Sequence, residues 1–387
     1  MKNNSLPVIV AVLLTWFGTQ AAQSADAVPS QSAVPVSVAM TLGEIERALA
    51  KYPPAWEHGE ARAAIAAALD RQVAVQVRDG MTDADRDQLR PLLEFYRRRV
   101  DAGLEALERT PVTAGVLVVK FYSSSLVLKS AAGSVAVDCC QGPINNGGEP
   151  ERRDDRRTGF YWTPEQRDRL ARLVDLSLIT HRHHDHADYS LARRLVACGK
   201  PVVGPRQLKE LWKDLADGIT VPESGRTQRV GPAEFDAFSG YQYAQSRLDA
   251  DGQREGFAGE IPAAETESIV YLFRVGGIAF LQGAENHVPT GEWLCQQIAR
   301  GWAPDVVLSV GQYQGQRSVD AVLRQLRPVF RIPVHEYELM HGGGGNRTSP
   351  WWTGPGRLAF DRRQAMPLFW GESFHLTRAE LDAAGTK

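Results

Sequence analysis

Four histidines and two aspartates lie within eight consecutive positions of the chain, in the stretch SLITHRHHDHADYS. Imidazole and carboxylate side chains are good zinc ligands, and a catalytic zinc keeps one coordination place open for water. In extended backbone, side chains two positions apart point the same way, so His181 and His183 can bind one ion together. Asp185 and His186 come where the chain turns into a helix, so they can reach a neighbouring position. The stretch therefore predicts a catalytic metal site for one ion or two.

The elements that position this cluster are predicted from the residues on either side of it. The strand predicted for LSLIT (176–180) stops where the histidines begin, and Leu191 and Leu195 then repeat at helical spacing. The alternative is a histidine-rich loop that binds no metal. The position of the cluster between a strand and a helix argues against this alternative. We interpret His184 and Asp188 as residues that point away from the ions or hydrogen-bond their ligands.

The rest of the chain predicts an α/β fold with helices packed outside the sheets. We expect a helical N-terminal extension over 41–112, which either mediates dimerisation or packs against the catalytic domain, and that domain over 113–387. A capping box at Thr41–Glu44 opens the extension, and Thr163-Pro164 is predicted to start a later helix. Three short β-rich runs occupy 115–138, whereas 222–265 is predicted to be irregular because it is rich in Gly and Pro.

The N-terminus has the pattern of a secretory signal peptide. Lys2 precedes the apolar run LPVIVAVLLTWF, and small residues follow it. We predict a signal peptide over 1–25, a flexible leader over 26–40 and a periplasmic or secreted protein, with an uncleaved anchor as the alternative. The formal net charge of −2 argues against a nucleic-acid partner, and no membrane association is expected after signal cleavage. The predicted partner is a small-molecule substrate.

The four cysteines do not form the framework of a disulfide-rich protein. They are Cys139, Cys140, Cys198 and Cys295, in a chain of 387 residues. The adjacent pair ends an apolar run and is predicted to lie at the end of a strand. We interpret all four as ordinary, mostly buried residues. A metal-binding role for the pair stays open, although its spacing is not that of a usual zinc site.

The motif THRHHDH (180–186) resembles the central motif of the metallo-β-lactamase superfamily. The resemblance covers about residues 113–375, and within the superfamily the chain looks most like the branch of ascorbate-phosphate lactonase-like proteins. It implies an αββα sandwich of two mixed sheets with the metal site at one edge between them. Asp138 ends the early β hairpin at a position that the superfamily often fills with aspartate.

The resemblance also implies further metal ligands, of which this chain retains some. His335 in IPVHEY stands where the superfamily has its last histidine. The segment expected to supply the third histidine of the first ion, 234–245, contains none, and Gln242 is the nearest substitute. Where dinuclear members carry a bridging aspartate, this chain has Ala284, followed by Glu285 and then His287.

These departures predict two unequal half-sites. Asp185, His186 and His335 provide three protein ligands, which is the usual number for a catalytic zinc. We expect one tightly bound zinc there. A second, weaker ion is expected at His181 and His183, completed by one of the substitute residues, of which Glu285 is our candidate.

The function that the resemblance implies is an exported zinc-dependent hydrolase. A zinc-bound hydroxide would attack a small ester, lactone, amide or phosphodiester, and Asp185 is the predicted catalytic residue that orients the water and moves its proton. Because two expected ligands are missing, the alternative is a non-catalytic metal- or ligand-binding protein of the same fold. An exported β-lactamase is a third interpretation, without specific support from other segments.

Overall fold

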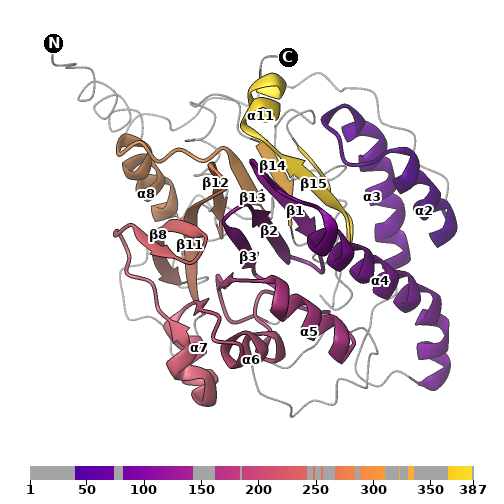
Figure 1. The fold of residues 1–387 in the computed structure, drawn as a ribbon, viewed down its shortest axis with the longest axis horizontal. Coiled ribbons are helices and arrows are strands. Elements are labelled where there is room, and N and C mark those ends of the chain that lie inside the picture. The colour runs from indigo at the N-terminus through magenta and orange to yellow at the C-terminus, as the bar shows by residue number, and fades with distance from the viewer. Residues whose placement is uncertain are drawn as a thin grey trace.

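Two β-sheets lie face to face in the computed structural model of the chain, and helices cover their outer faces (Figure 1). The structure describes residues 40–73, 82–142, 162–183, 185–241, 247–248, 254–255, 266–283, 288–309, 322, 330–334 and 365–385. The predicted αββα sandwich is therefore confirmed. The signal peptide predicted for 1–25 and nearly all of the leader lie outside the described residues. Within these ranges, no helix has the length and hydrophobicity needed to cross a bilayer.

The larger sheet has seven strands in the order β15-β1-β2-β3-β4-β5-β6. They are β1 (Val116–Lys120), β2 (Leu126–Ser130), β3 (Gly133–Val137), β4 (Leu176–Leu178), β5 (Val202–Val203), β6 (Ile219–Thr220) and β15 (Ser373–Leu376). The first three strands coincide with the three β-rich runs of the sequence and form an antiparallel meander, whereas β3 to β6 run parallel to one another. Because β3 and β4 run parallel, their carboxyl ends lie at the same edge of the sheet.

The second sheet has six strands in the order β14-β13-β12-β11-β8-β7. They are β7 (Gln228–Val230), β8 (Ala233–Tyr241), β11 (Glu267–Val275), β12 (Ile278–Gln282), β13 (Val306–Ser309) and β14 (Phe330–Pro333), and the short β9 (Arg247–Leu248) and β10 (Arg254–Glu255) pair separately. The irregular structure predicted for 222–265 is wrong at β7 and β8. The long antiparallel pairing of β8 with β11 buries Phe235 and Ala237, which outweighs the weak local preference for a strand.

The core between the sheets is built from alternate residues of their strands. Val116 and Val118 of β1 pack with Ile269 of β11 in one buried cluster. Leu117 and Val119 point to the opposite face of β1 and pack beneath the helices. A strand covered on both faces reads as a nearly continuous apolar run, which explains the sequence VLVVK.

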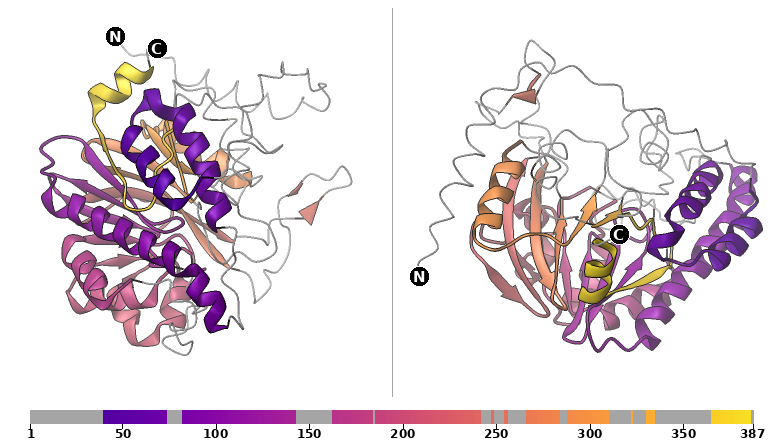
Figure 2. Two further views of the ribbon diagram at one scale, coloured as in Figure 1. Left: turned by 90° about the vertical axis from the view of Figure 1, so that its right-hand side faces the viewer. Right: turned by 90° about the horizontal axis from the view of Figure 1, so that it is seen from above.

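The helices form the two outer layers (Figure 2). They are α2 (Leu42–Lys51), α3 (Gly59–Val73), α4 (Asp83–Arg109), α5 (Pro164–Leu173), α6 (Tyr189–Ala197), α7 (Arg206–Leu211), α8 (Val288–Ala299) and α11 (Arg378–Gly385). The capping box predicted at Thr41 is present before α2, and the helix start predicted at Thr163-Pro164 is confirmed by α5, where Thr163 and Gln166 also form a capping box. Helix α8 packs on the second sheet through Trp293 and Leu294.

The helices of the N-terminal segment pack against the sandwich. Val100, Leu104 and Leu107 of α4 share a buried cluster with the outer face of β1. At the edge of this contact, Arg169 of α5 pairs with Glu108 of α4 at 2.9 Å. Of the two roles proposed for residues 41–112, packing against the larger domain is therefore observed. The boundary at residue 112 stays a prediction.

Candidate metal centre

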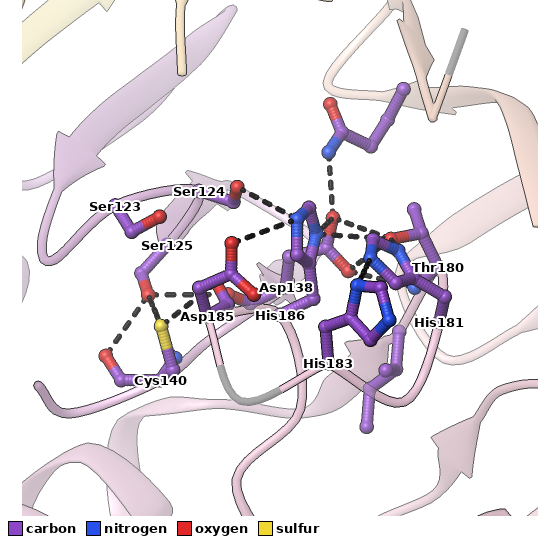
Figure 3. Close-up of polar contacts among 12 residues, drawn as sticks. Ser123, Ser124, Ser125, Asp138, Cys140, Thr180, His181, His183, Asp185 and His186 are labelled. Atoms are coloured by element: carbon purple, nitrogen blue, oxygen red, sulfur yellow. Dashed lines mark hydrogen bonds and ion pairs between the residues drawn. The ribbon is translucent and has the colours of Figure 1, made fainter. Parts of the chain in front are cut away.

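The site lies where β3 and β4 end, at the edge of the sandwich. These strands run parallel in register, with Val137 opposite Leu178, so the residues that follow them meet at one edge. Asp138 follows β3 and Thr180 follows β4 (Figure 3). The backbone N–H of Ile269 donates to the Thr180 carbonyl at 2.8 Å, which joins this edge to β11 of the second sheet. The residues that follow β3 and β4 thus lie at an edge between the two sheets.

The side chains of His181 and His183 converge, as alternation along extended backbone predicts. His181 Nε2 lies 3.1 Å from His183 Nδ1, and the two rings meet edge to face. The His186 ring is also close, with its centroid 3.9 Å from that of His181. His181 and His186 are buried, whereas His183 is partly exposed. Three imidazoles of the motif thus gather at one point, and His184 lies outside the described residues.

Asp185 and His186 form the adjacent half of the site. His186 Nε2 lies 3.6 Å from Asp185 Oδ2, and both side chains are buried. The other ring nitrogen, His186 Nδ1, lies 3.0 Å from Asp138 Oδ2. The imidazole therefore has one nitrogen held by a carboxylate from β3 and one directed towards Asp185.

Asp138 is a fully buried carboxylate that organises this edge. Its Oδ1 accepts the backbone N–H of Thr180 at 2.7 Å, and its Oδ2 accepts Gln282 Nε2 at 2.6 Å and faces His186. Its backbone has φ of 46°, which is uncommon for a residue other than glycine. The sequence indicated Asp138 only by its place at a strand end. It carried no sign of Gln282, which arrives from β12.

These hydrogen bonds determine which imidazole nitrogens point into the site. We assign the hydrogen of His186 to Nδ1, which faces Asp138 Oδ2 at 3.0 Å and lies 3.2 Å from Thr180 Oγ1, so that Nε2 keeps its lone pair. Thr180 Oγ1 donates to Asp138 at 2.9 Å and therefore accepts from His181 Nδ1 at 3.0 Å. His181 Nε2 is then an acceptor directed at His183. Hydrogen bonds of this kind orient the histidine ligands of protein metal sites.

Two of the donor atoms have nearly the spacing of two ligands to one zinc ion. For zinc–nitrogen bonds of 2.0–2.1 Å in a tetrahedral site, two ligand nitrogens stand about 3.4 Å apart. His181 Nε2 and His183 Nδ1 come close to this spacing at 3.1 Å. Among the described residues, no group of three or more His, Cys, Asp or Glu side chains is placed to hold one ion. The predicted third ligands, His335 and Glu285, lie outside the described residues, as do Gln242 and His287.

The cysteine pair next to the site has a structural role. Burial, together with the nearby charge of Asp188, raises the pKa of the Cys139 thiol, and burial raises that of Cys140 well above its usual value. Cys140 Sγ donates to the Asp185 carbonyl at 3.0 Å. Both thiols are thus kept protonated in the absence of a metal, and all four cysteines are free. The prediction of burial is wrong for Cys198, which is exposed.

Asp188 holds the helix after the motif instead of facing the ligands. Its Oδ1 accepts the Leu191 N–H at 3.0 Å, which caps α6, and its Oδ2 accepts Gln141 Nε2 at 2.9 Å. The Gln141 carbonyl accepts the Tyr96 hydroxyl at 2.6 Å. This chain of hydrogen bonds connects α4 to the loop that follows β3. Asp188 therefore caps α6 and holds the loop after β3.

Two further residues next to the motif carried no sequence signal. Thr266 Oγ1 lies 3.3 Å from His183 Nε2, and Ser124 Oγ lies 3.4 Å from His186 Nε2. Thr266 precedes β11, and Ser124 belongs to the turn between β1 and β2. Hydroxyl residues in loops are common, so only the folded chain identifies them.

Comparison with known proteins gives similarity only at the level of structure. No protein-family model matches the sequence, and no curated protein is significantly similar to it. A possible metal-dependent hydrolase from Veillonella parvula is 12% identical with a TM-score of 0.46, over 68% of this chain and 100% of that one. The metallo hydrolase Igni18 from Ignicoccus hospitalis is 15% identical with a TM-score of 0.41, over 67% and 98%. The metallo-beta-lactamase fold protein YhfI from Bacillus subtilis is 13% identical with a TM-score of 0.40, over 68% and 99%. At such identities the likeness concerns the path of the chain and not its reaction.

Proposed function

We propose that this protein is an exported, zinc-dependent hydrolase that acts on a small ester, lactone, amide or phosphodiester. The observation that carries the proposal is the convergence of ligand atoms at the edge of the sandwich. His181 Nε2 and His183 Nδ1 face one another at 3.1 Å, and Asp185 and His186 lie beside them. Thr180 and Asp138 contact the ring nitrogens of His181 and His186 that point away from the site, and they orient the two rings. Such contacts are typical of metal sites that act in catalysis.

The protein's own residues would divide the work as follows. A bound zinc ion supplies an acidified water and a Lewis acid for the substrate oxygen. His181, His183, Asp185 and His186 would hold the metal, and Asp138 would keep His186 in the orientation that leaves its Nε2 available. The Asp185 carboxylate would orient the attacking water and accept its proton. Its burial removes competing solvent, which strengthens its interaction with the water.

We propose two unequal metal sites. Asp185, His186 and His335 would hold one zinc tightly, whereas the pair His181 and His183 would bind a second ion weakly. The test is a titration of metal-free protein with zinc, in which the bound metal is quantified at equilibrium. We expect one tight and one weak binding step. Two equally tight ions per chain would contradict the proposal.

Hydrolysis is measured with a panel of lactones, phosphodiesters and β-lactams. The β-lactams test whether the protein is a β-lactamase. We expect Asp185→Ala to lose at least about 100-fold of any activity, because it removes a proton acceptor. His335→Ala should lose activity and tight metal binding together. The matched control is Asp168→Ala, because Asp168 lies on the exposed surface of α5. Normal activity and metal binding in both site variants would refute the assignment.

A second candidate function is metal or ligand binding without catalysis. The observation in its favour is in the sequence: residues 234–245 contain no histidine, and Ala284 stands where dinuclear members of the superfamily carry a bridging aspartate. It predicts metal binding to the wild-type protein with no turnover of any substrate in the panel. Export is tested separately by measuring the mass of the protein in the periplasmic or secreted fraction, which should lack about 25 residues, as expected for a cleaved signal peptide.

A further inference from the structure

The turn between β1 and β2 brings three consecutive serines, 123–125, to the metal centre (Figure 3). The Phe121 N–H donates to the Ser125 carbonyl at 2.9 Å, and the Ser125 N–H donates to the Tyr122 carbonyl at 2.8 Å. Within this tight turn, Ser123 has φ of 48°. A residue other than glycine pays a conformational cost in this region, and such strained residues cluster at functional sites.

The turn is held in place from both sides. Ser125 Oγ accepts the Cys140 N–H at 2.7 Å and lies 2.9 Å from the Cys140 carbonyl, which ties the turn to the loop after β3. The buried Lys120 ammonium donates to the Ser123 carbonyl. A buried charge without hydrogen-bond partners is costly. Lys120 therefore stabilises the strained backbone conformation of Ser123, because in that conformation the Ser123 carbonyl faces the ammonium group. The position of the middle serine, Ser124, is therefore well determined.

The hydroxyl of Ser124 lies on the side of His186 that is directed into the site. Ser124 Oγ is buried and lies 3.4 Å from His186 Nε2. With the hydrogen of His186 assigned to Nδ1, which faces Asp138, the Ser124 hydroxyl donates to Nε2 in the metal-free protein. The same Nε2 lies 3.6 Å from Asp185 Oδ2. Ser124, Asp185 and His186 thus surround one small region.

The length of this contact is informative. At 3.4 Å the hydrogen bond is near the outer limit for an O–H donor and is correspondingly weak. The hydroxyl can therefore turn to a new acceptor at little cost, while the turn itself stays fixed. A donor that is fixed in place before the reaction, at a site where negative charge develops, stabilises a transition state.

We propose that Ser124 is a catalytic residue of this site, and this inference rests on the proposed hydrolase function. Its hydroxyl donates to His186 Nε2 in the metal-free protein. In the loaded enzyme it donates instead to the substrate oxygen on which negative charge builds up during attack. Ser124 does not become covalently attached to the substrate; it contributes one hydrogen bond.

The experiment compares Ser124→Ala with Ser134→Ala, since Ser134 is also a buried serine but lies on β3, away from the motif. At saturating zinc, we expect Ser124→Ala to lower kcat by about 100-fold or more, with a much smaller change in KM, because an oxyanion donor acts in the transition state. Ser124→Thr keeps the hydroxyl and should restore part of the rate. Ser134→Ala should retain the wild-type kcat.

Two measurements on the metal-free proteins need no activity. In nitrogen NMR spectra, the His186 Nε2 signal of Ser124→Ala should move towards that of an imidazole nitrogen without a hydrogen bond, whereas Ser134→Ala should leave it in place. Thermal denaturation of the variants shows whether a loss of kcat comes from unfolding.

The outcomes separate this inference from the proposed function. An active wild type with equal kcat in Ser124→Ala and Ser134→Ala overturns the role of Ser124 and leaves the hydrolase proposal intact. An inactive wild type with tight zinc binding overturns the hydrolase proposal and the substrate contact of Ser124 with it. An unchanged His186 signal in Ser124→Ala overturns the hydrogen bond itself, whatever the activity.

Discussion

Replacing Asp138 by asparagine should destabilise the protein strongly, although the two side chains have the same shape. The carboxylate faces donors on both oxygens. Oδ1 accepts the Thr180 N–H, whereas Oδ2 faces His186 Nδ1 and accepts Gln282 Nε2. Asparagine keeps one acceptor oxygen and replaces the other with an amide group that only donates. If the asparagine oxygen accepts from Thr180, the asparagine NH2 group faces two other donors, His186 Nδ1 and Gln282 Nε2.

The size of the effect follows from the number of hydrogen bonds lost. Each buried hydrogen bond that is left unmade costs about 1–3 kcal/mol, so two cost roughly 2–6 kcal/mol. The orientation of His186 is lost as well. Residues that orient a metal-binding histidine typically contribute about 10–100-fold to metal affinity. We therefore expect lower stability and weaker zinc binding in the same variant.

The assay is urea denaturation of the metal-free protein, followed by competition for zinc with a chelator. The control is Asp175→Asn, because this partly exposed carboxylate accepts Ser134 N–H and Lys200 Nζ and should change stability by less than about 1 kcal/mol. A free energy of unfolding for Asp138→Asn within 1 kcal/mol of the wild type, together with unchanged zinc affinity, would refute our account of this edge.

Two further predictions concern the packing of the N-terminal helices. Arg169 lowers the pKa of Glu108 below its usual 4.5, so their bond stabilises the fold above that pH and is lost as the pH falls through the lower, folded-state pKa. Glu108→Gln should lower the free energy of unfolding by up to about 1 kcal/mol at pH 7 and leave it unchanged in strong acid. Denaturation of both proteins at several pH values measures this difference. A difference that does not depend on pH would contradict this reasoning. Gly371 has φ of 70°, and an added Cβ would lie 1.6 Å from the Arg99 carbonyl oxygen. Gly371→Ala should therefore lower the free energy of unfolding by clearly more than Gly199→Ala, which has a similar φ but open space and should cost about 1–2 kcal/mol; equal losses would show that the collision is relieved without cost.

Local patterns were enough to predict the elements that carry the motif. The strand at 176–178, the helix from Tyr189, the capping box at Thr41 and the helix start at Thr163 depend on neighbouring residues, and the structure contains all of them. The same reasoning failed at β8, where Gly and Pro nearby suggested irregular structure. That strand exists because β11 lies beside it, and a partner from another part of the chain leaves no trace in local composition.

The spacing in the motif predicted that His181 and His183 converge, because alternation along the backbone is a local property, and their side chains do so. Only the tertiary structure determined which other residues form hydrogen bonds with the side chains of the site. Gln282 reaches Asp138 across 144 residues, and Ser124 reaches His186 across 62. Such contacts arise because parallel strands end at a common edge and a second sheet packs over it. A glutamine and a serine carry no periodic signal, so their hydrogen bonds to the site become visible only when the two sheets are brought together.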